Sequence, residues 1–169
     1  MADESKPVVI VTGSSGYLGS AVVRRLHGCY RVVGLDRYSP PHPPHQAECV
    51  CFDITDQASV DTALDRVRLA YGDRIAACIH LAGYFDLSGE DDPAYDAVTV
   101  EGSKRLMKGL QGFELEQFVF ASTMLAHAPT EPGEPIDEDH PLDPRFPYRA
   151  SKVRTEKVLR EVRGDEKLV

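Results

Sequence analysis

Short apolar runs alternate with longer amphipathic stretches along most of this chain. Runs rich in Val, Ile and Leu predict buried strands, and apolar residues that recur every three or four positions predict helices. Strands that alternate with helices at this spacing are typical of an α/β fold, a parallel, doubly wound sheet in three layers. We predict strands at residues 8–11, 30–35, 48–52, 75–81 and 116–122, and helices at 17–27, 56–71, 93–110 and 149–162.

Three stretches between these elements have a composition that opposes regular structure. Residues 38–46 contain four prolines, which remove backbone donors and fix φ. Residues 83–92 and 128–147 are also predicted to be loops, and the second of these is rich in Pro, Asp and Glu. Since neither a repeat nor a dividing linker interrupts the pattern, we expect residues 1–169 to form one domain.

Charge and composition narrow the range of partners. The 169 residues include 19 basic and 27 acidic side chains, which gives a formal net charge of −8. Because the chain has no long basic run, we expect it to bind neither nucleic acid nor a membrane surface. The polar start at residues 1–6 does not resemble a secretion signal, and no apolar stretch approaches the roughly 20 residues that span a bilayer. These features predict a cytoplasmic protein that acts on a small molecule.

Glycines at three positions separate the first predicted strand from the first predicted helix. Gly13 allows a tight turn, Gly16 lets backbone approach a phosphate, and Gly19 lets the helix pack closely on the strand. The free amides and the dipole at the helix N-terminus favour an anion, so this turn predicts a pyrophosphate cradle. Further candidate contacts in the turn are Ser15, Tyr17 and Leu18.

An acidic residue, Asp36, ends the second predicted strand roughly 20 residues after Gly13, as in dinucleotide-binding motifs. Its carboxylate can accept hydrogen bonds from the adenosine ribose and would repel a 2′-phosphate. The sequence therefore predicts NAD rather than NADP as cofactor. The adjacent Arg37 leaves an alternative open, because a guanidinium can stack on adenine or hold a phosphate.

Another carboxylate follows the third predicted strand. Asp53, next to Ile54, is placed to accept a hydrogen bond from the adenine amino group. The alternative for this segment is a local one, in which Thr55 or Asp56 caps the following helix. Both roles can hold together, so Asp53 and Ile54 are candidate cofactor contacts.

Small residues follow the fourth predicted strand. Leu81, Ala82 and Gly83 would let a cofactor lie against the backbone at the same edge of the sheet. The preceding His80 is expected to be a packed or hydrogen-bonded side chain rather than a catalyst. Tyr84 is a candidate for the substrate side.

The last predicted helix carries Tyr148 and Lys152 four positions apart, so both side chains project from one face. An ammonium and a positive nicotinamide ring both favour the phenolate and would lower the pKa of Tyr148. Lowering this pKa from about 10 to about 7 takes roughly 4 kcal/mol. Two close cations in a partly desolvated site supply energy of that order. We therefore predict that Tyr148 takes a proton from a substrate hydroxyl while NAD accepts a hydride.

Together these motifs resemble the extended short-chain dehydrogenase/reductase family, the branch of NAD-dependent nucleotide-sugar epimerases and dehydratases. The resemblance implies a Rossmann-like NAD-binding fold and reaction at a hydroxyl of a sugar or nucleotide sugar. The matching pieces follow the family's order through nearly the whole chain: Thr-Gly-x-x-Gly-x-x-Gly at 12–19, the acid at 36, Asp-x-Thr-Asp at 53–56, His-Leu-Ala-Gly at 80–83, Ser-Thr at 122–123 and Tyr-x-x-x-Lys at 148–152.

The resemblance also implies roles for the two hydroxyls after the fifth predicted strand. Thr123 would hydrogen-bond the reacting oxygen, and Ser122 would support it near the nicotinamide; the two roles could also be exchanged. The family often has asparagine where this chain has Thr99, which places any proton relay through that position in doubt.

Two further departures bear on the reaction. Similar dehydratases carry Asp-Glu after the threonine, whereas this chain has Met124 and Leu125, which disfavours sugar 4,6-dehydration. His127 stands where many members have tyrosine, and it could contact substrate or be a solvated loop residue.

Family members are longer than this chain, with a sixth parallel strand and a small C-terminal substrate domain. We therefore expect residues 1–169 to be the NAD-binding half with the catalytic residues, the substrate domain being absent. Residues 166–169 resemble the opening of the sixth strand. The fifth strand would then be an unpaired apolar edge, which favours association. The resemblance implies a homodimer formed through helices around 94–110 and 148–162.

Three functions remain open from the sequence. An epimerase would remove a hydride from a sugar and return it to the other face. A dehydrogenase or reductase of the same family would instead release the reduced cofactor after acting on a sugar acid, sterol or flavonoid alcohol. A non-catalytic dinucleotide-binding module is the third possibility, although it has no need of Thr123, Tyr148 and Lys152.

Overall fold

The computed structural model describes residues 6–37, 46–86 and 88–163. Most of the predicted loop at 38–46 and the segment at 166–169 therefore lie outside the described residues. Within these three ranges, the structure contains no helix long and apolar enough to cross a membrane.

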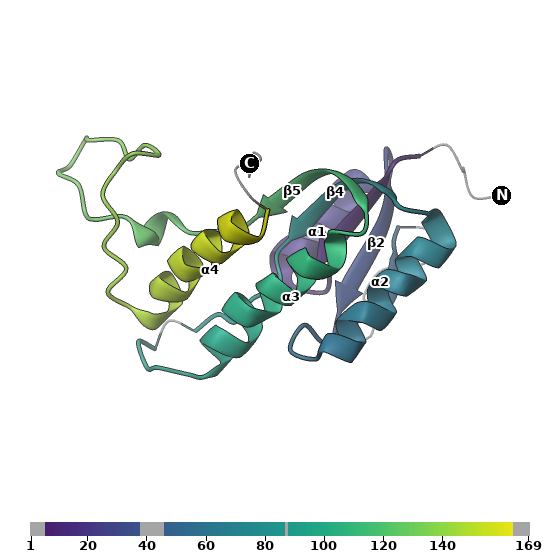
Figure 1. The fold of residues 1–169 in the computed structure, drawn as a ribbon. Coiled ribbons are helices and arrows are strands. Elements are labelled where there is room, and N and C mark those ends of the chain that lie inside the picture. The colour runs from purple at the N-terminus through teal and green to yellow at the C-terminus, as the bar shows by residue number, and fades with distance from the viewer. Residues whose placement is uncertain (1–5, 38–45, 87, 164–169) are drawn as a thin grey trace.

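A single parallel sheet has the strand order β3-β2-β1-β4-β5 (Figure 1). All five residues of β1 are buried, as expected for a central strand covered on both faces. The α/β doubly wound fold predicted from the sequence is confirmed. The strands are β1 (Val8–Thr12), β2 (Arg31–Asp36), β3 (Glu48–Cys51), β4 (Arg74–His80) and β5 (Glu114–Phe120).

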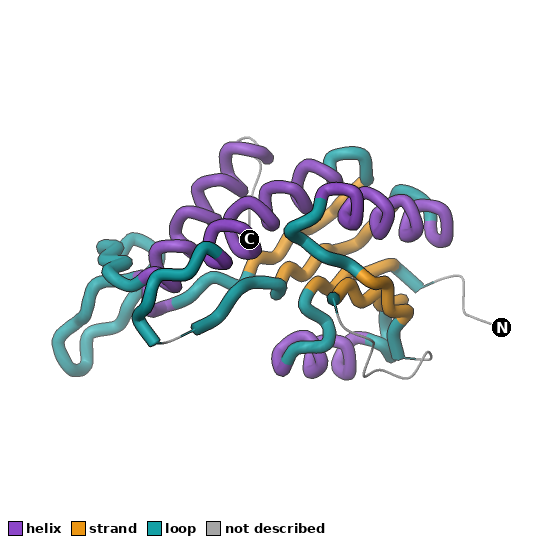
Figure 2. The backbone as a smooth tube through the Cα atoms, turned by 90° about the horizontal axis from the view of Figure 1, so that it is seen from below, coloured by secondary structure: helices purple, strands orange, loops and turns teal. Residues whose placement is uncertain are grey.

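Helices cover the two faces of the sheet unequally. The helices are α1 (Tyr17–Leu26), α2 (Gln57–Tyr71), α3 (Glu101–Leu110) and α4 (Pro147–Arg163). In Figure 2, α2, α3 and α4 lie above the sheet and α1 lies below it. The larger apolar core lies under α2 and α3, and a smaller one joins α1 to β1 and β2. This arrangement gives the three layers expected from the alternating pattern.

The helix predicted at 93–110 begins differently from the prediction. Its first part is a π-helix, Tyr95–Val100, and α3 starts only at Glu101. The carbonyl of Thr99 accepts a hydrogen bond from the Ser103 hydroxyl at 2.5 Å. The Thr155 hydroxyl, which donates to the Ser151 carbonyl at 2.8 Å, also lies 3.2 Å from the Thr99 carbonyl. Side-chain donors of this kind compete with backbone amides for the carbonyls of the helix. The spacing of apolar residues along the sequence does not reveal such competition or a π-helical turn.

The edge strand β5 also differs from the expected apolar edge. Its exposed residues are Glu114, Glu116 and Gln117, and Glu116 forms a salt bridge of 3.1 Å with Arg74 of β4. Charged side chains on an edge oppose pairing with another strand. The expected apolar character of this edge is therefore wrong for its exposed positions, and association of the chain stays a prediction.

Candidate active site

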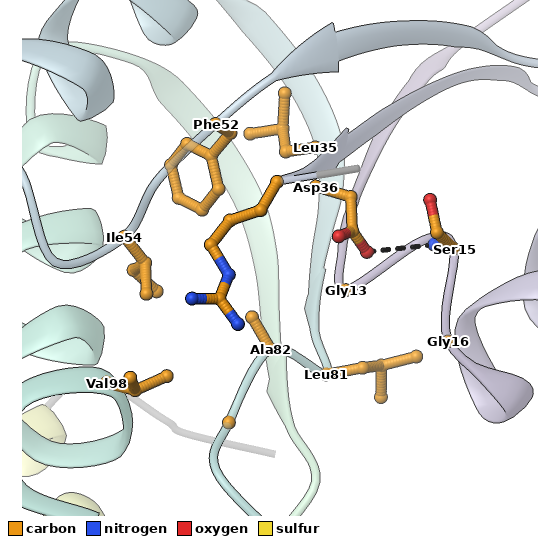
Figure 3. A pocket seen from close by; sticks show the side chains of 12 residues that line it. Gly13, Ser15, Gly16, Leu35, Asp36, Phe52, Ile54, Leu81, Ala82 and Val98 are labelled. Atoms are coloured by element: carbon orange, nitrogen blue, oxygen red, sulfur yellow. Dashed lines mark hydrogen bonds between the residues drawn. The ribbon is translucent and has the colours of Figure 1, made fainter. Parts of the chain in front are cut away.

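Two adjoining cavities open at the carboxyl ends of β1 and β4, where the strand order reverses. Such a reversal is the usual ligand site of an open α/β sheet. The first cavity, of about 290 Å³, is lined by Gly13, Ser15, Gly16, Leu35, Asp36, Arg37, Phe52, Ile54, Leu81, Ala82, Gly83 and Val98 (Figure 3). The second, of about 470 Å³, is lined by Gly13, Gly16, Tyr17, Leu18, Gly19, Leu81, Gly83, Tyr84, Phe85, Ala121, Ser122, Tyr148 and Lys152.

Glycine is required in the turn that both cavities share. Gly13 has φ +67°, and a Cβ there would lie 2.9 Å from the Ala82 nitrogen. A Cβ on Gly19 would lie 2.1 Å from the Gly13 oxygen, which is a severe overlap with backbone. Gly16 precedes α1, whose N-terminus therefore meets the cavities. Glycine at 13 and 19 lets the turn pack tightly against the end of β4 and against its own backbone, and such a turn before a helix N-terminus fits the pyrophosphate of a dinucleotide.

Asp36 lies directly beside the glycine turn, at the edge of the first cavity. Its Oδ2 accepts a hydrogen bond from the Ser15 backbone nitrogen at 2.9 Å (Figure 3). The end of β2 is thereby tied to the turn, with Arg37 as the next lining residue. A carboxylate at this edge fits a ribose diol better than a second phosphate.

Asp53 is held by a local turn. Its Oδ1 accepts from both the nitrogen and the hydroxyl of Thr55, at 2.9 and 2.7 Å, and these bonds lower the pKa of Asp53. Its neighbours Phe52 and Ile54 line the first cavity. The helix cap is Asp56, which accepts from the Ala58 nitrogen at 3.1 Å, so one of the two capping residues considered is confirmed.

Lys152 is nearly buried beside the second cavity. Its Nζ donates to the Ala121 carbonyl at 2.9 Å and lies 4.8 Å from the centre of the Phe120 ring. Burial lowers the pKa of Lys152 to about 8. A Cβ on Gly83 would lie 3.4 Å from the same Nζ, so glycine there lets the ammonium reach the cavity wall.

Tyr148 is half-buried on the same helix, with its ring packed edge-on against Phe85 at 5.0 Å between centres. Burial raises the pKa of Tyr148, and a hydrogen bond with the Thr123 hydroxyl opposes this shift. The Lys152 ammonium donates to Ala121, and its Nζ lies 5.9 Å from the Tyr148 ring centre. The predicted lowering, which also requires the positive nicotinamide ring, stays a prediction. Thr123 Oγ1 also accepts from the Leu125 nitrogen at 3.2 Å.

Some residues near the site were not anticipated from the sequence. Ser122 Oγ donates to Glu156, which lies one helical turn beyond Lys152 on the same face of α4. The spacing of four residues after Lys152 was the available signal. Val98 lines the first cavity from the π-helix, and nothing in its sequence neighbourhood indicates this.

His127, for which two roles were open, is tied to the loop before α4. Its Nδ1 lies 3.1 Å from the His140 carbonyl, and its backbone forms an isolated antiparallel bridge with Leu142. These contacts favour a structural role for the ring in closing this loop.

A family model described as "NAD dependent epimerase/dehydratase family" matches residues 9–168. The chain belongs to this family. The resemblance noted from the motifs is thereby confirmed, and NAD is the cofactor of the family.

Known relatives include both epimerases and dehydrogenases. UDP-glucose 4-epimerase of Mycolicibacterium smegmatis is 33% identical over 92% of this chain and 51% of its own length. A 3-beta-hydroxysteroid dehydrogenase of Mycolicibacterium neoaurum is 30% identical over 94% of the chain and 44% of its own length. The chain thus spans about half the length of these relatives.

Solved structures show the same fold. A short-chain dehydrogenase/reductase superfamily protein from Agrobacterium tumefaciens, solved with bound NAD, has a TM-score of 0.75 and 28% identity. The match covers 95% of this chain and 46% of that one. Pal from Bacillus thuringiensis has a TM-score of 0.79 at 23% identity, over 95% of this chain and 53% of its own.

Proposed function

We propose that this chain binds NAD along the two adjoining cavities. The pyrophosphate would lie at the N-terminus of α1 beside the glycine turn, whose Gly13, Ser15 and Gly16 amides already donate within the protein. The adenosine would lie in the first cavity with its ribose on Asp36. The nicotinamide would lie in the second cavity, beside Tyr148. The position of the turn supports this orientation, because Gly13 and Gly16 line both cavities.

The reaction that we propose is oxidation of a hydroxyl on a sugar nucleotide, followed by return of hydride, as in an epimerase. NAD supplies the hydride acceptor when it is bound. Tyr148 would accept the hydroxyl proton, Lys152 would stabilise the resulting phenolate, and Thr123 would hydrogen-bond the reacting oxygen. Sequence identity of 31–33% with UDP-glucose 4-epimerases supports this substrate class.

One observation carries the proposal. Tyr148 and Lys152 line the same cavity as Gly13 and Gly16, although almost the whole chain separates the two pairs. A phenol, a buried ammonium and an anion-binding turn around one cavity form the arrangement that hydride transfer from an alcohol requires.

A second candidate is a dehydrogenase that releases NADH after acting on an apolar alcohol such as a sterol. Large apolar side chains are exposed at the mouth of the second cavity, with Tyr17 92%, Leu18 60% and Phe85 63% exposed. The relationship to a 3-beta-hydroxysteroid dehydrogenase favours the same reading.

Two measurements separate these functions. Titration calorimetry with NAD and NADP tests the cofactor, and we expect NAD to bind more tightly. Incubation with UDP-glucose and NAD, followed by product NMR and NADH absorbance, tests the reaction. UDP-galactose without net NADH supports the epimerase, NADH with a sterol substrate supports the dehydrogenase, and failure to bind NAD overturns both.

A further inference from the structure

A chain of buried hydrogen bonds runs from the cofactor-facing backbone to the π-helix. His80, at the end of β4, is fully buried, and both of its ring nitrogens have partners. Nδ1 lies 2.6 Å from Thr12 Oγ1, and Nε2 lies 2.7 Å from Ser103 Oγ. The histidine thus joins the end of β1 to α3 through the inside of the molecule.

Each end of this chain continues to backbone. Ser103 Oγ donates to the Thr99 carbonyl at 2.5 Å. At the other end, Thr12 Oγ1 accepts from the backbone nitrogen of Ala82 at 3.1 Å and from that of Leu81 at 3.2 Å, the Leu81 bond being shared with the Thr12 carbonyl, also at 3.2 Å. Leu81 and Ala82 line the first cavity, so the last bonds of the chain hold its wall.

The direction of every proton in the chain follows from its two ends. A carbonyl only accepts, so the Ser103 proton goes to Thr99 and Ser103 Oγ must accept from His80 Nε2–H. Thr12 Oγ1 already accepts two amides, so its own proton goes to His80 Nδ1. If Nδ1 carried a proton, alone or together with Nε2, it could not accept from Thr12. The Thr12 hydroxyl proton would then have no acceptor in this series of hydrogen bonds.

We propose that His80 is a positioning residue, a neutral Nε2–H imidazole that fixes the backbone of Leu81 and Ala82 against the cofactor. The benefit to NAD binding rests on the proposed function, whereas the tautomer and the backbone restraint do not. Burial and the nearby Lys152 ammonium lower the pKa of His80 to about 3, which agrees with a ring that stays neutral.

The first test reads the tautomer directly. In nitrogen-15 NMR of the specifically labelled chain, His80 should show a protonated Nε2 and an unprotonated Nδ1, with no titration between about pH 5 and pH 8, the range in which an ordinary histidine titrates. A proton on Nδ1, or an ordinary histidine titration, would overturn the proposal.

The second test compares two buried hydroxyls near the Thr99 carbonyl. Ser103 donates to it at 2.5 Å, whereas Thr155 lies 3.2 Å from it and also donates to the Ser151 carbonyl at 2.8 Å. Ser103→Ala removes the acceptor of the His80 Nε2–H group. The imidazole and the Thr12 hydroxyl bonded to it should then be less firmly held, so the Ala82 amide should exchange with solvent faster. NAD affinity should fall about tenfold, as expected when a buried donor loses its partner. The matched control is Thr155→Val, which removes the other fully buried hydroxyl near Thr99 but leaves His80 untouched.

The outcomes of this comparison are distinct. Faster Ala82 exchange and weaker NAD binding in Ser103→Ala alone support the proposal. Equal changes in both variants would mean that Ser103 contributes only to overall stability, and this result would overturn the proposal. If the wild-type chain bound no NAD, the proposed function would fail, while the tautomer and the Ala82 exchange would still decide the role of His80.

Discussion

The two cavities on either side of the glycine turn are built in different ways. The first uses residues that directly end β2, β3 and β4, together with backbone of the turn. The second needs the end of β5 and side chains of α4, brought from the far end of the described chain. Cofactor recognition is therefore mostly a local property of strand ends, whereas the chemistry depends on how distant elements pack. Substitutions should accordingly separate binding from turnover.

The largest effect is expected in the second cavity. Tyr148→Phe keeps the ring against Phe85 but removes the proposed base, so kcat for UDP-glucose should fall about a thousandfold. NAD affinity, measured by calorimetry, should stay within about threefold. The control is Tyr71→Phe, which removes a hydroxyl bonded to Glu48 on another part of the surface. Unchanged turnover in Tyr148→Phe would contradict the assignment of the chemistry to the second cavity.

The turn itself should be most sensitive to added volume. In Gly19→Ala the new Cβ meets the Gly13 oxygen, an overlap that costs up to about 3 kcal/mol of folding stability. Relief of the overlap must move the Gly13 carbonyl and with it the turn, so we expect NAD affinity to fall roughly a hundredfold. Gly28→Ala is the matched control, because its Cβ would meet nothing within 4 Å. Calorimetric titration with NAD compares the two, and equal affinities would show that close packing at the turn is not needed.

Lys152, which lines the second cavity, should make the folding stability of the protein depend on pH. Burial lowers its pKa from 10.5 to about 8, so between these values the unfolded chain binds a proton that the folded chain has released. The free energy of unfolding should therefore rise with pH across this window. Lys152→Met should remove up to about 3 kcal/mol of this rise, as measured by urea unfolding below and above the window. A parallel pH dependence in both chains would contradict the burial of the ammonium.

A smaller effect is expected for charge in the first cavity. Asp36→Asn keeps an oxygen that can accept from the Ser15 nitrogen but removes the negative charge. The ratio of NADP to NAD affinity should rise about tenfold, or about 1.4 kcal/mol. Asp56→Asn, at the cap of α2, is the control and should leave the ratio unchanged. An unchanged ratio of NADP to NAD affinity in Asp36→Asn would show that the carboxylate does not select between the two cofactors.

Most elements of the fold could be predicted from local pattern. The strand predicted at 8–11 is Val8–Thr12, and the helix predicted at 149–162 is Pro147–Arg163. The π-helix at Tyr95–Val100 could not be predicted, because apolar periodicity does not distinguish such a turn from an α-helix. Val98 was missed because it reaches the cavity from this π-helix, and Glu156 was missed although its spacing after Lys152 was a signal. The glycine turn and Asp36 were found.

The sequence alone determined the glycine turn, the acid at the end of β2 and a phenol and an ammonium on one helix face, because each depends on spacing along the chain. Only the tertiary structure decided that Lys152 bonds Ala121, that burial raises the pKa of Tyr148, and that His80 joins Thr12 to Ser103. These properties arise from burial and from contacts between segments far apart in the sequence. Such contacts are set by the order of the strands and the packing of the helices, which no local pattern encodes.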